Sequence, residues 1–255
     1  MRFSGKIARA TVVAALAAVT AAGCGGGGAP EATPTQMPDP VKTQLAAVAG
    51  VGVDSTILAA TGNSVAVYPA PGAPAAAATP KLRLANPNQD GAKLVLLVTA
   101  KMPGWWQVLL PVQPNGSTGW VKAEQVTASS TPYRIVVSRG QHTLTLYKSD
   151  ASIAVEKVAI GTSDTPTPGG RFYLAELLKP PNPNGPYGPY AFGLNGFSTT
   201  LDSFEGQDPV IGLHGTNQPQ LLGQDVSHGC IRLSNDAITR LAGTVPTGTP
   251  VDIIA

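Results

Sequence analysis

A cysteine and two histidines lie close together near the end of the 255-residue chain. His214 stands in Ile-Gly-Leu-His-Gly-Thr-Asn at residues 211–217, and Cys230 stands in Val-Ser-His-Gly-Cys-Ile-Arg-Leu at residues 226–233. A free thiol has a pKa of about 8.5, so only a small fraction is the nucleophilic thiolate near neutral pH. A positioned imidazole can remove the thiol proton, and a cation nearby can stabilise the thiolate. This pattern predicts a thiol nucleophile with a histidine base.

Other interpretations of the same residues stay open. A cysteine is often an inert, buried apolar residue, and a histidine often serves only to hydrogen-bond. Zinc sites need three or four ligands, whereas the chain after Cys24 offers one cysteine and three histidines, with His142 far from the others in sequence. A disulfide between Cys24 and Cys230 is a further alternative. We expect no metal ion and no cofactor.

Three separate blocks carry a family resemblance. The first combines His-Gly at residues 214–215 with Ser-His-Gly-Cys-Ile-Arg at residues 227–232, about a dozen residues further on. A second motif, Gly-Thr-Ser-Asp-Thr-Pro-Thr-Pro-Gly-Gly-Arg-Phe, fills residues 161–172, and Gly-Thr-Pro-Val-Asp-Ile fills residues 248–253. In this order the blocks resemble the L,D-transpeptidase (YkuD-type) catalytic domain over residues 133–255.

The resemblance implies a β-rich domain with the cysteine at the rim of a sheet. Members of the family cleave the bond between an L-centre and D-alanine in a peptidoglycan tetrapeptide stem. The acyl group forms a thioester and then passes to the amine of a diamino acid in a neighbouring stem, which gives a 3→3 cross-link. The resemblance also implies carbapenem-type β-lactams as inhibitors and peptidoglycan stem peptides as partners.

Catalytic roles follow residue by residue from the resemblance. Cys230 matches the nucleophile and His214 the general base, with one ring nitrogen toward the thiol and the other held by a backbone carbonyl, expected to be that of Gly215. Backbone N–H groups of Gly229 and Cys230, with His228 in support, are expected to form the oxyanion hole. A glycine at position 229 would leave the substrate's approach open.

Further residues are assigned supporting or substrate-binding roles. Arg232 is expected to bind a substrate carboxylate, because its guanidinium fork matches that shape; a structural ion pair or loop clamp is the alternative. Ser227 either hydrogen-bonds the site or shapes the turn. Weaker candidates for substrate contacts are Thr216 and Asn217.

The segment 179–207 is rich in proline, glycine and aromatic residues. A loop of that length in a compact domain usually serves a function or is disordered. We expect Tyr187, Tyr190 and Phe192 to form a lid over the stem peptide, with proline-rich surface packing as the alternative.

Elsewhere the pattern predicts a mainly β chain. Short apolar runs at residues 64–68, 93–99, 106–111 and 119–121 alternate with turn signals, which is typical of a small antiparallel barrel. Gly-Trp-Trp-Gln-Val at residues 104–108 and Gly-Trp-Val at residues 119–121 resemble bacterial SH3-like domains. We therefore expect an SH3-like barrel at residues 51–128 and a β-rich catalytic domain at residues 132–255. The tryptophans either fill the barrel's core or form a shelf for glycan or peptide.

The catalytic domain should contain strands at residues 133–138, 143–147, 153–160, 170–175 and 210–214. The first two alternate apolar and polar residues and suggest a hairpin. One short helix is expected at residues 235–242, capped by Ser234. The fold class is thus mainly β, with one or two short helices.

The first 24 residues predict an exported protein. Arg2, Lys6 and Arg9 precede a short apolar run that ends in Ala-Ala-Gly-Cys. This ending resembles a bacterial lipobox, which implies lipidation of Cys24 and a membrane anchor; simple secretion is the alternative. Residues 25–50 are expected to form a flexible linker. The predicted location is the outer face of the cytoplasmic membrane, in the cell wall.

Charge argues against a nucleic-acid partner. Charged residues make up only 13% of the chain, whose formal charge is +2. The predicted signal peptide holds three basic residues and no acid, so the remaining 14 basic and 15 acidic residues give a charge near −1. Such a chain has no basic field for polyphosphate.

Three functions are compatible with these patterns. The first is an L,D-transpeptidase, the second is an L,D-carboxypeptidase that uses water as acceptor, and the third is a non-catalytic wall-binding or anchoring protein. The nucleophile is the same in the first two, so the sequence does not separate them.

Overall fold

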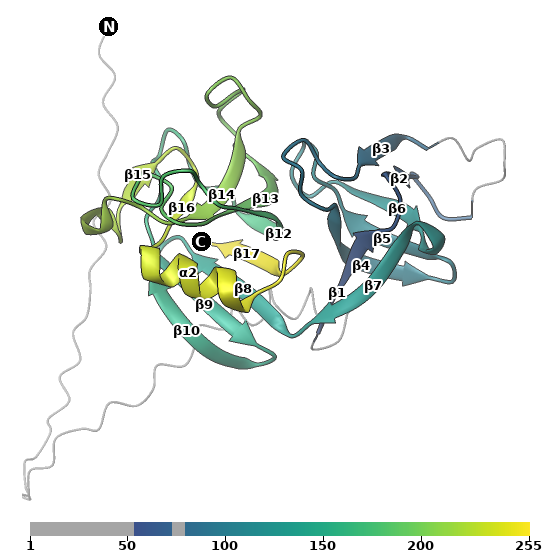
Figure 1. Cartoon of the computed structure of the whole chain (residues 1–255), viewed down its shortest axis with the longest axis horizontal. Coiled ribbons are helices and arrows are strands. Elements are labelled where there is room, and N and C mark those ends of the chain that lie inside the picture. Colours follow the sequence, from purple (N-terminus) through teal and green to yellow (C-terminus); the bar gives the residue numbers. More distant parts are fainter. Residues whose placement is uncertain (1–53, 73–79) are drawn as a thin grey trace, which may run out of the picture. The chain divides into compact units, whose positions relative to one another are not determined.

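The computed structural model describes residues 54–72 and 80–255, which belong to one compact unit (Figure 1). The signal peptide, the lipidation of Cys24 and the linker at residues 25–50 therefore lie outside the described residues. The described chain is mainly β with one α-helix and short 3₁₀ turns, which confirms the predicted fold class. No helix in this described part is both long and apolar enough to cross a membrane.

The first half of the described chain forms a five-stranded antiparallel sheet in the order β6-β5-β4-β1-β7. Its strands are β1 (Ser55–Ala60), β4 (Val95–Met102), β5 (Trp105–Leu109), β6 (Thr118–Lys122) and β7 (Val126–Thr131). A separate pair joins β2 (Ser64–Val67) to β3 (Leu82–Ala85). Each predicted apolar run overlaps one of these strands. Apolar residues of these strands form one buried core.

The tryptophans of this sheet are half-buried. Trp106 packs against the core, and Lys101 Nζ lies 4.8 Å from the centre of its ring. Trp105 meets the edge of Tyr68, with ring centres 5.2 Å apart. The packing of Trp106 agrees with the expectation that the tryptophans contribute to the core.

The second half forms an eight-stranded sheet in the order β10-β9-β8-β17-β12-β13-β14-β16. Its strands are β8 (Tyr133–Ser138), β9 (Thr143–Lys148), β10 (Ala151–Lys157), β12 (Gly170–Leu178), β13 (Ala191–Phe197), β14 (Val210–His214), β16 (Ile231–Arg232) and β17 (Pro250–Ile254). The predicted hairpin is the pair β8–β9. A small parallel pair joins β11 (Ile160–Gly161) to β15 (Asp225–Ser227).

The α-helix is α2 (Asn235–Thr244), which lies beside the sheet in Figure 1. The Ser234 hydroxyl accepts a hydrogen bond from the Ala237 N–H at 3.1 Å, which satisfies one of the free amides at the helix start. Ala237, Ile238 and Leu241 pack into the same core as the strands. The predicted helix and its Ser234 cap are therefore confirmed.

The segment 179–207 is not one long loop, because β13 runs through it and pairs with β12 and β14. The sequence pattern did not predict β13 because the strand contains Gly193 and Gly196. A Cβ on Gly196 would overlap the ring of Phe172, and a Cβ on Gly193 would lie 2.8 Å from the Glu176 carboxylate. Glycine in a strand often marks such close packing.

Side chains of the two larger sheets interlock within the compact unit. Tyr173 of β12 is fully buried in the core of the first sheet, and Asn195 Nδ2 donates to the carbonyl of Leu110 at 3.4 Å. Asn88 Nδ2 donates to the Glu176 carboxylate at 2.7 Å. Burial raises the pKa of Glu176, an effect that the Asn88 bond opposes. The two sheets therefore pack against each other and share buried surface.

Candidate active site

Adjacent parallel strands bring the cysteine and the histidine to one edge of the large sheet. β14 pairs with β16, with Leu213 opposite Ile231 and His214 opposite Arg232. Cys230 directly precedes β16, so it lies beside the middle of β14. Its Sγ is 4.0 Å from the carbonyl oxygen of Val210. The 16-residue separation in sequence is therefore closed by strand pairing.

His214 is buried and its ring is fixed by its own neighbour. Nδ1 lies 2.7 Å from the carbonyl oxygen of Gly215, as predicted. Because a carbonyl only accepts, Nδ1 carries the proton, and in a neutral ring Nε2 is left as the acceptor. Burial lowers the pKa of His214 to about 4; the Gly215 bond opposes this and the charge of Arg232 adds to it. The imidazole is therefore neutral, and able to accept a proton, at neutral pH.

Cys230 is partly buried and not in a disulfide. Burial raises the pKa of its thiol, whereas a backbone hydrogen bond from Gly212 and the charge of Arg232 lower it. The resting site thus holds a neutral thiol and a neutral imidazole rather than an ion pair. Proton transfer would then accompany nucleophilic attack, which is general-base catalysis.

Arg232 supplies the positive charge of the site. Its charge acts on Cys230, His214 and Tyr187. Among the described residues it forms no ion pair, and its buried Nε has no hydrogen-bond partner. A buried donor without a partner is costly. The alternative of a structural ion pair is therefore not observed, and the guanidinium has hydrogen-bonding capacity left for a substrate.

The turn that carries Cys230 is closed by Ser227. Its hydroxyl donates to the carbonyl of Cys230 at 2.6 Å and accepts from the Gly229 N–H at 3.1 Å. Ser227 thus shapes the turn, one of its two predicted alternatives. The Gly229 N–H is thus already engaged with Ser227, and its part in an oxyanion hole stays a prediction. The amides of His228 and Cys230 are the other candidates.

Gly229 is required for a reason other than the one expected. Its φ of +115° lies in a region that side chains rarely adopt, and a Cβ there would lie 2.8 Å from Cδ1 of Ile211. The missing side chain therefore makes room for the core beneath the turn, not for an approaching substrate.

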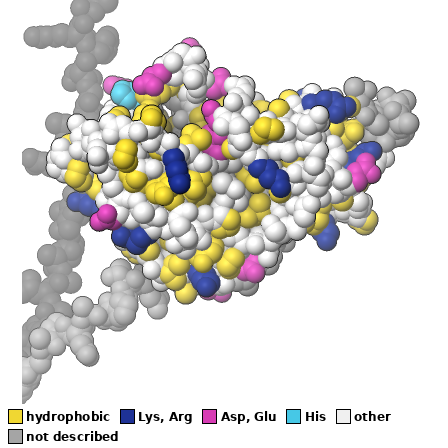
Figure 2. All heavy atoms as spheres, viewed as in Figure 1, with side chains coloured by type: hydrophobic (Ala, Val, Ile, Leu, Met, Phe, Trp, Pro, Cys, Tyr) yellow, Lys and Arg dark blue, Asp and Glu magenta, His cyan; other side chains and the backbone are white. Residues whose placement is uncertain are grey.

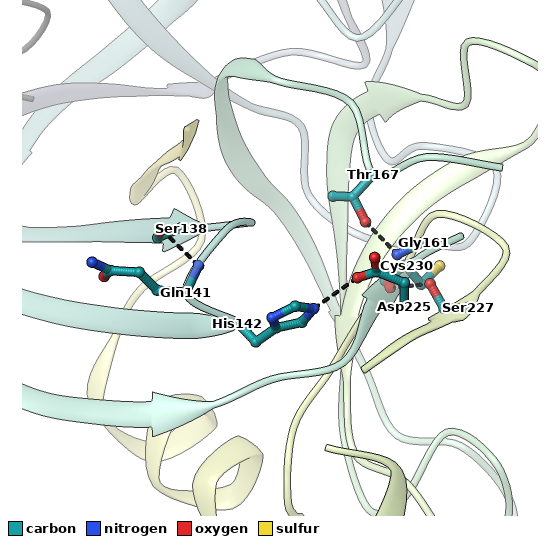
Figure 3. A network of polar contacts seen from close by, with 8 residues as sticks. All are labelled: Ser138, Gln141, His142, Gly161, Thr167, Asp225, Ser227 and Cys230. Carbon is teal, nitrogen blue, oxygen red and sulfur yellow. Dashed lines mark hydrogen bonds and ion pairs between the residues drawn. The ribbon is translucent and has the colours of Figure 1, made fainter. Parts of the chain in front are cut away.

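Two threonines of the Thr-Pro-Thr segment at residues 165–167 hydrogen-bond to the turn that carries Cys230. Thr167 Oγ1 accepts from the Gly161 N–H at 2.8 Å (Figure 3). It also donates to the carbonyl of Gly229 at 2.8 Å. Thr165 Oγ1 donates to the carbonyl of Ser227 at 3.1 Å. Sequence reasoning noted the block but assigned it no role. A threonine between two prolines was the available signal, because the neighbouring prolines have no N–H to donate and the threonine adds a side-chain hydroxyl.

His142 braces the strand that leads to this turn. Its Nε2 lies 2.7 Å from Oδ1 of Asp225, the first residue of β15 (Figure 3). No group of three or more His, Cys, Asp or Glu side chains is gathered at a metal-binding distance in the described part of the chain.

Tyr187 packs on the catalytic histidine. The two ring centres are 4.9 Å apart, with an angle of 58° between the planes. Burial, the charge of Glu205 and the charge of Cys230 raise the pKa of Tyr187, and Arg232 lowers it. Its phenol therefore lies among the charged groups of the site, where the predicted substrate contact is possible.

A glycine pair holds Tyr187 in place. A Cβ on Gly188, whose φ is +64°, would overlap Asn235 and lie 2.7 Å from Gly215 Cα. Asn235 Oδ1 accepts from the Thr216 N–H at 2.9 Å. The backbones therefore approach closely only because both glycines lack side chains. Asn235 was missed from the sequence, where it appeared only as a helix start.

The remaining predicted residues are placed as follows. Tyr190 packs against the core, and its carbonyl accepts from the Gly215 N–H at 3.3 Å. Phe192 is 1% exposed within the core, so its expected lid role is wrong: it points inward from β13. Thr216 is buried, with its hydroxyl accepting from the Gln218 N–H at 3.1 Å. Asn217 is exposed.

His228 is exposed beside the catalytic turn. Its ring centre is 5.8 Å from that of Phe204, in the segment 198–209 that joins β13 to β14. This segment follows β13 in the chain, whereas Tyr187 lies in the loop that precedes β13. Sequence reasoning had treated its first residues as part of the single long loop.

The large β sheet thus carries a cysteine and a histidine on adjacent paired strands, with Nδ1 of the histidine bonded to the Gly215 carbonyl, residue types that suit a thiol nucleophile with a histidine base. The model of the L,D-transpeptidase catalytic domain matches residues 132–253. YkuD of Bacillus licheniformis, classed as an L,D-transpeptidase, is 36% identical over 154 residues, which are 58% of this chain and 85% of that protein. YkuD of Bacillus subtilis is 38% identical over 151 residues, 57% of this chain and 84% of that protein.

The chain belongs to the YkuD-type L,D-transpeptidase family and is therefore an acyltransferase enzyme. Among solved structures, an L,D-transpeptidase from Mycobacterium smegmatis matches with a TM-score of 0.42 and 16% identity, over 63% of this chain and 90% of that one. L,D-transpeptidase 3 from Mycobacterium tuberculosis, solved with a faropenem-derived adduct, matches with a TM-score of 0.41 and 16% identity, over 64% and 91%. These two similarities are low, and no argument is based on them.

Proposed function

We propose that the protein forms 3→3 cross-links between peptidoglycan stem peptides through a thioester on Cys230. The observation that carries this proposal is the pairing of β14 with β16, which brings the sulfur beside the strand that ends in a neutral His214 with Nε2 unprotonated. A neutral imidazole next to a thiol suits proton removal at the moment of attack.

In the first half-reaction, the Cys230 sulfur attacks the carbonyl of the third residue of a tetrapeptide stem. His214 Nε2 takes the thiol proton. The amides of His228 and Cys230 donate to the oxyanion, since the Gly229 amide is engaged with Ser227. The bond to D-alanine then breaks, His214 returns the proton to the leaving amine, and a thioester remains.

In the second half-reaction, the amine of a diamino acid in a neighbouring stem attacks the thioester. His214 takes a proton from that amine, the new amide bond forms, and the thiol is regenerated. Arg232 binds a carboxylate of a stem peptide, because the residue is partly exposed, its Nε has no hydrogen-bond partner and it forms no ion pair with the described carboxylates. Tyr187, which packs on His214, lines the donor site.

The acyl-enzyme is tested by intact-mass spectrometry of the purified protein. Incubation with a carbapenem should add the mass of one inhibitor molecule to the wild type, and none to Cys230→Ala. An adduct that persists in the variant would disprove the role of Cys230.

The acceptor is tested with a disaccharide-tetrapeptide as the only substrate. A transpeptidase yields a cross-linked dimer together with D-alanine. Tripeptide without dimer would instead support an L,D-carboxypeptidase, in which water attacks the thioester. If Cys230→Ala supports wild-type cross-linking in cells that lack redundant enzymes, the wall-anchoring function is favoured over both.

We also propose that residues 51–128 form an SH3-like domain, which the five-stranded antiparallel sheet supports.

We further propose that residues 1–24 direct export, and that Cys24 is lipidated and anchors the enzyme at the outer face of the cytoplasmic membrane. The observation that supports export and lipidation is the sequence Ala-Ala-Gly-Cys after a short apolar run. Intact mass of the protein from membranes should exceed the mass of the chain from Cys24 by a lipid group. Release of Cys24→Ala into the medium is expected, and its retention at the membrane would contradict the anchor.

A further inference from the structure

A hollow lies where the two larger sheets meet, and part of its wall comes from the segment 198–209. It has a volume of about 670 Å³, which is within the usual range for small-ligand sites. We call it the junction pocket, and it is lined by Gln113, Pro114, Asn115, Phe197, Ser198, Thr199, Thr200, Leu201 and Asp202. It therefore combines the turn before β6 with the chain that leaves β13.

The walls of the junction pocket are held by hydrogen bonds. Asn115 Nδ2 donates to the Phe197 carbonyl at 2.8 Å, and its Oδ1 accepts from the Phe197 N–H at 2.9 Å. The buried hydroxyl of Ser198 accepts from the N–H groups of Thr200 and Leu201, at 3.3 and 3.1 Å. Both sides of the pocket are thus preformed in the absence of a ligand.

The chemistry of the lining favours a neutral, hydroxyl-rich ligand. Five lining side chains carry neutral amides or hydroxyls, and the charged one is the carboxylate of Asp202. No lining residue is basic, so a carboxylate or phosphate ligand would meet no compensating charge. Phe197, Pro114 and Leu201 add apolar surface. Amides and hydroxyls beside such surface are suited to a sugar, which has both hydroxyl groups and apolar C–H faces.

The junction pocket lies one strand away from the reactive sulfur. Phe197 is the partner of Val210 in the β13–β14 pair, and Cys230 Sγ lies 4.0 Å from the Val210 carbonyl. The Ser198 N–H also donates to the Pro209 carbonyl at 2.8 Å. Neighbouring strands are about 4.8 Å apart. A ligand of modest length can therefore reach from the pocket to the sulfur.

This reach matches the proposed donor. Three extended residues span at most about 10 Å, and the carbonyl that Cys230 would attack belongs to the third residue of the stem. The sugar that bears the stem is then separated from the sulfur by at most about that distance plus the length of the linker that joins it to the first residue.

We propose that the junction pocket binds a neutral N-acetylated sugar of the glycan strand that carries the donor stem. The naming of the glycan rests on the proposed function, whereas the preference for a neutral sugar follows from the lining. Arg232 would hold the peptide end of the donor and the junction pocket its sugar end, so glycan-linked stems would be preferred over free peptide.

Binding is tested with a peptide-free tetrasaccharide of N-acetylglucosamine, by calorimetry on the purified protein. Thr200→Trp places bulk in the pocket at an exposed position, and Gln113→Ala removes a hydrogen-bonding group. Each should weaken binding, the first by at least about tenfold. Ser203→Trp adds the same bulk at an exposed residue of the same segment that does not line the pocket, and it should bind as the wild type does. Equal affinity of wild type and Thr200→Trp, or no binding by the wild type, would overturn the proposal.

Kinetics separate this proposal from the proposed function. For Thr200→Trp, kcat/KM should fall about tenfold with the disaccharide-tetrapeptide and stay unchanged with the free tetrapeptide. Equal losses with both donors would contradict a sugar site. If no donor acylates Cys230 at all, the proposed function fails, and the tetrasaccharide measurement still decides the junction pocket.

Discussion

The carbonyl oxygen of Gly215 lies 2.7 Å from Nδ1 of His214, the residue before it, and thereby fixes which ring nitrogen carries the proton. The Gly215 carbonyl favours the protonated ring, but burial has the larger effect on the pKa of His214. Burial and the charge of Arg232 both disfavour the protonated ring. The site is therefore arranged for a base that is neutral at rest.

The first prediction concerns the pH dependence of acylation. Because the pKa of His214 is lowered to about 4, the base is lost only as the pH falls toward that value. The rate of carbapenem addition to Cys230, measured by stopped-flow absorbance, should be nearly constant from neutral pH down to about 5. An acid limb centred at 6.5, the ordinary histidine value, would contradict a buried neutral base.

The second prediction concerns stability in acid. The unfolded chain binds a proton on His214 near pH 6.5, whereas the folded chain does so only near pH 4. Stability contributed by the neutral ring is therefore complete above pH 6.5 and is lost as the pH falls from 6.5 to 4, by about 3 kcal/mol.

This loss is measured by urea unfolding at a series of pH values, with His214→Asn as the comparison. Asparagine can still donate to the Gly215 carbonyl but does not titrate. The free energy of unfolding of the variant should change less between pH 6.5 and 4 than that of the wild type. If the free energies of unfolding of wild type and variant change equally with pH, His214 has the same pKa in the folded and the unfolded chain, and the prediction is wrong.

The third prediction concerns the support beneath the catalytic turn. Thr167→Val keeps the shape of the side chain but removes its hydroxyl, leaving the Gly229 carbonyl and the Gly161 N–H without this partner. We expect about 1–3 kcal/mol lower stability. The acylation rate should fall about tenfold or more, since the Cys230 turn loses its support. Ser163→Ala, a change at an exposed hydroxyl of the same segment, should alter neither quantity.

Much of the site could be predicted because it depends on local chemistry. The strand at residues 210–214 and the helix capped by Ser234 each involve neighbouring residues or a simple alternation, whereas the bond from His214 to Gly215 was expected from the resemblance. The pairing of Cys230 with His214 came from the resemblance, which carries information on distant contacts that no periodicity contains.

The errors arose at positions where packing against other segments determines the local structure. β13 was missed because its glycines accommodate Phe172 and Glu176, which lie on another strand. For the same reason Phe192 was assigned to a lid although it lies in the core. The bond from the Gly229 N–H to Ser227, a detail of turn geometry, was likewise not predicted. Sequence spacing does not report such contacts between distant or folded-back segments.

The fourth prediction concerns the glycine contact that seats Tyr187. Gly188→Ala adds a Cβ that would lie 2.7 Å from Gly215 Cα, at a residue whose φ is +64°. The loop must move, and Tyr187 with it, so kcat/KM should fall about tenfold. Gly91→Ala is a matched control, because its φ is +80° but nothing lies within 4 Å of the added Cβ. It carries the same strain without the clash, and it should leave kcat/KM unchanged while reducing stability by about 1 kcal/mol.

The fifth prediction separates charge from shape at Arg232. Its charge lowers the pKa of the Cys230 thiol against the larger effect of burial. Arg232→Gln should therefore raise that pKa further, whereas Arg232→Lys should preserve it. The pH dependence of iodoacetamide alkylation, with Cys230→Ala to confirm that no other thiol reacts, reports this pKa directly. If the guanidinium fork also binds a stem carboxylate, Arg232→Lys should raise KM for the tetrapeptide donor while alkylation stays as in the wild type. A lysine variant with wild-type KM would leave Arg232 with an electrostatic role alone.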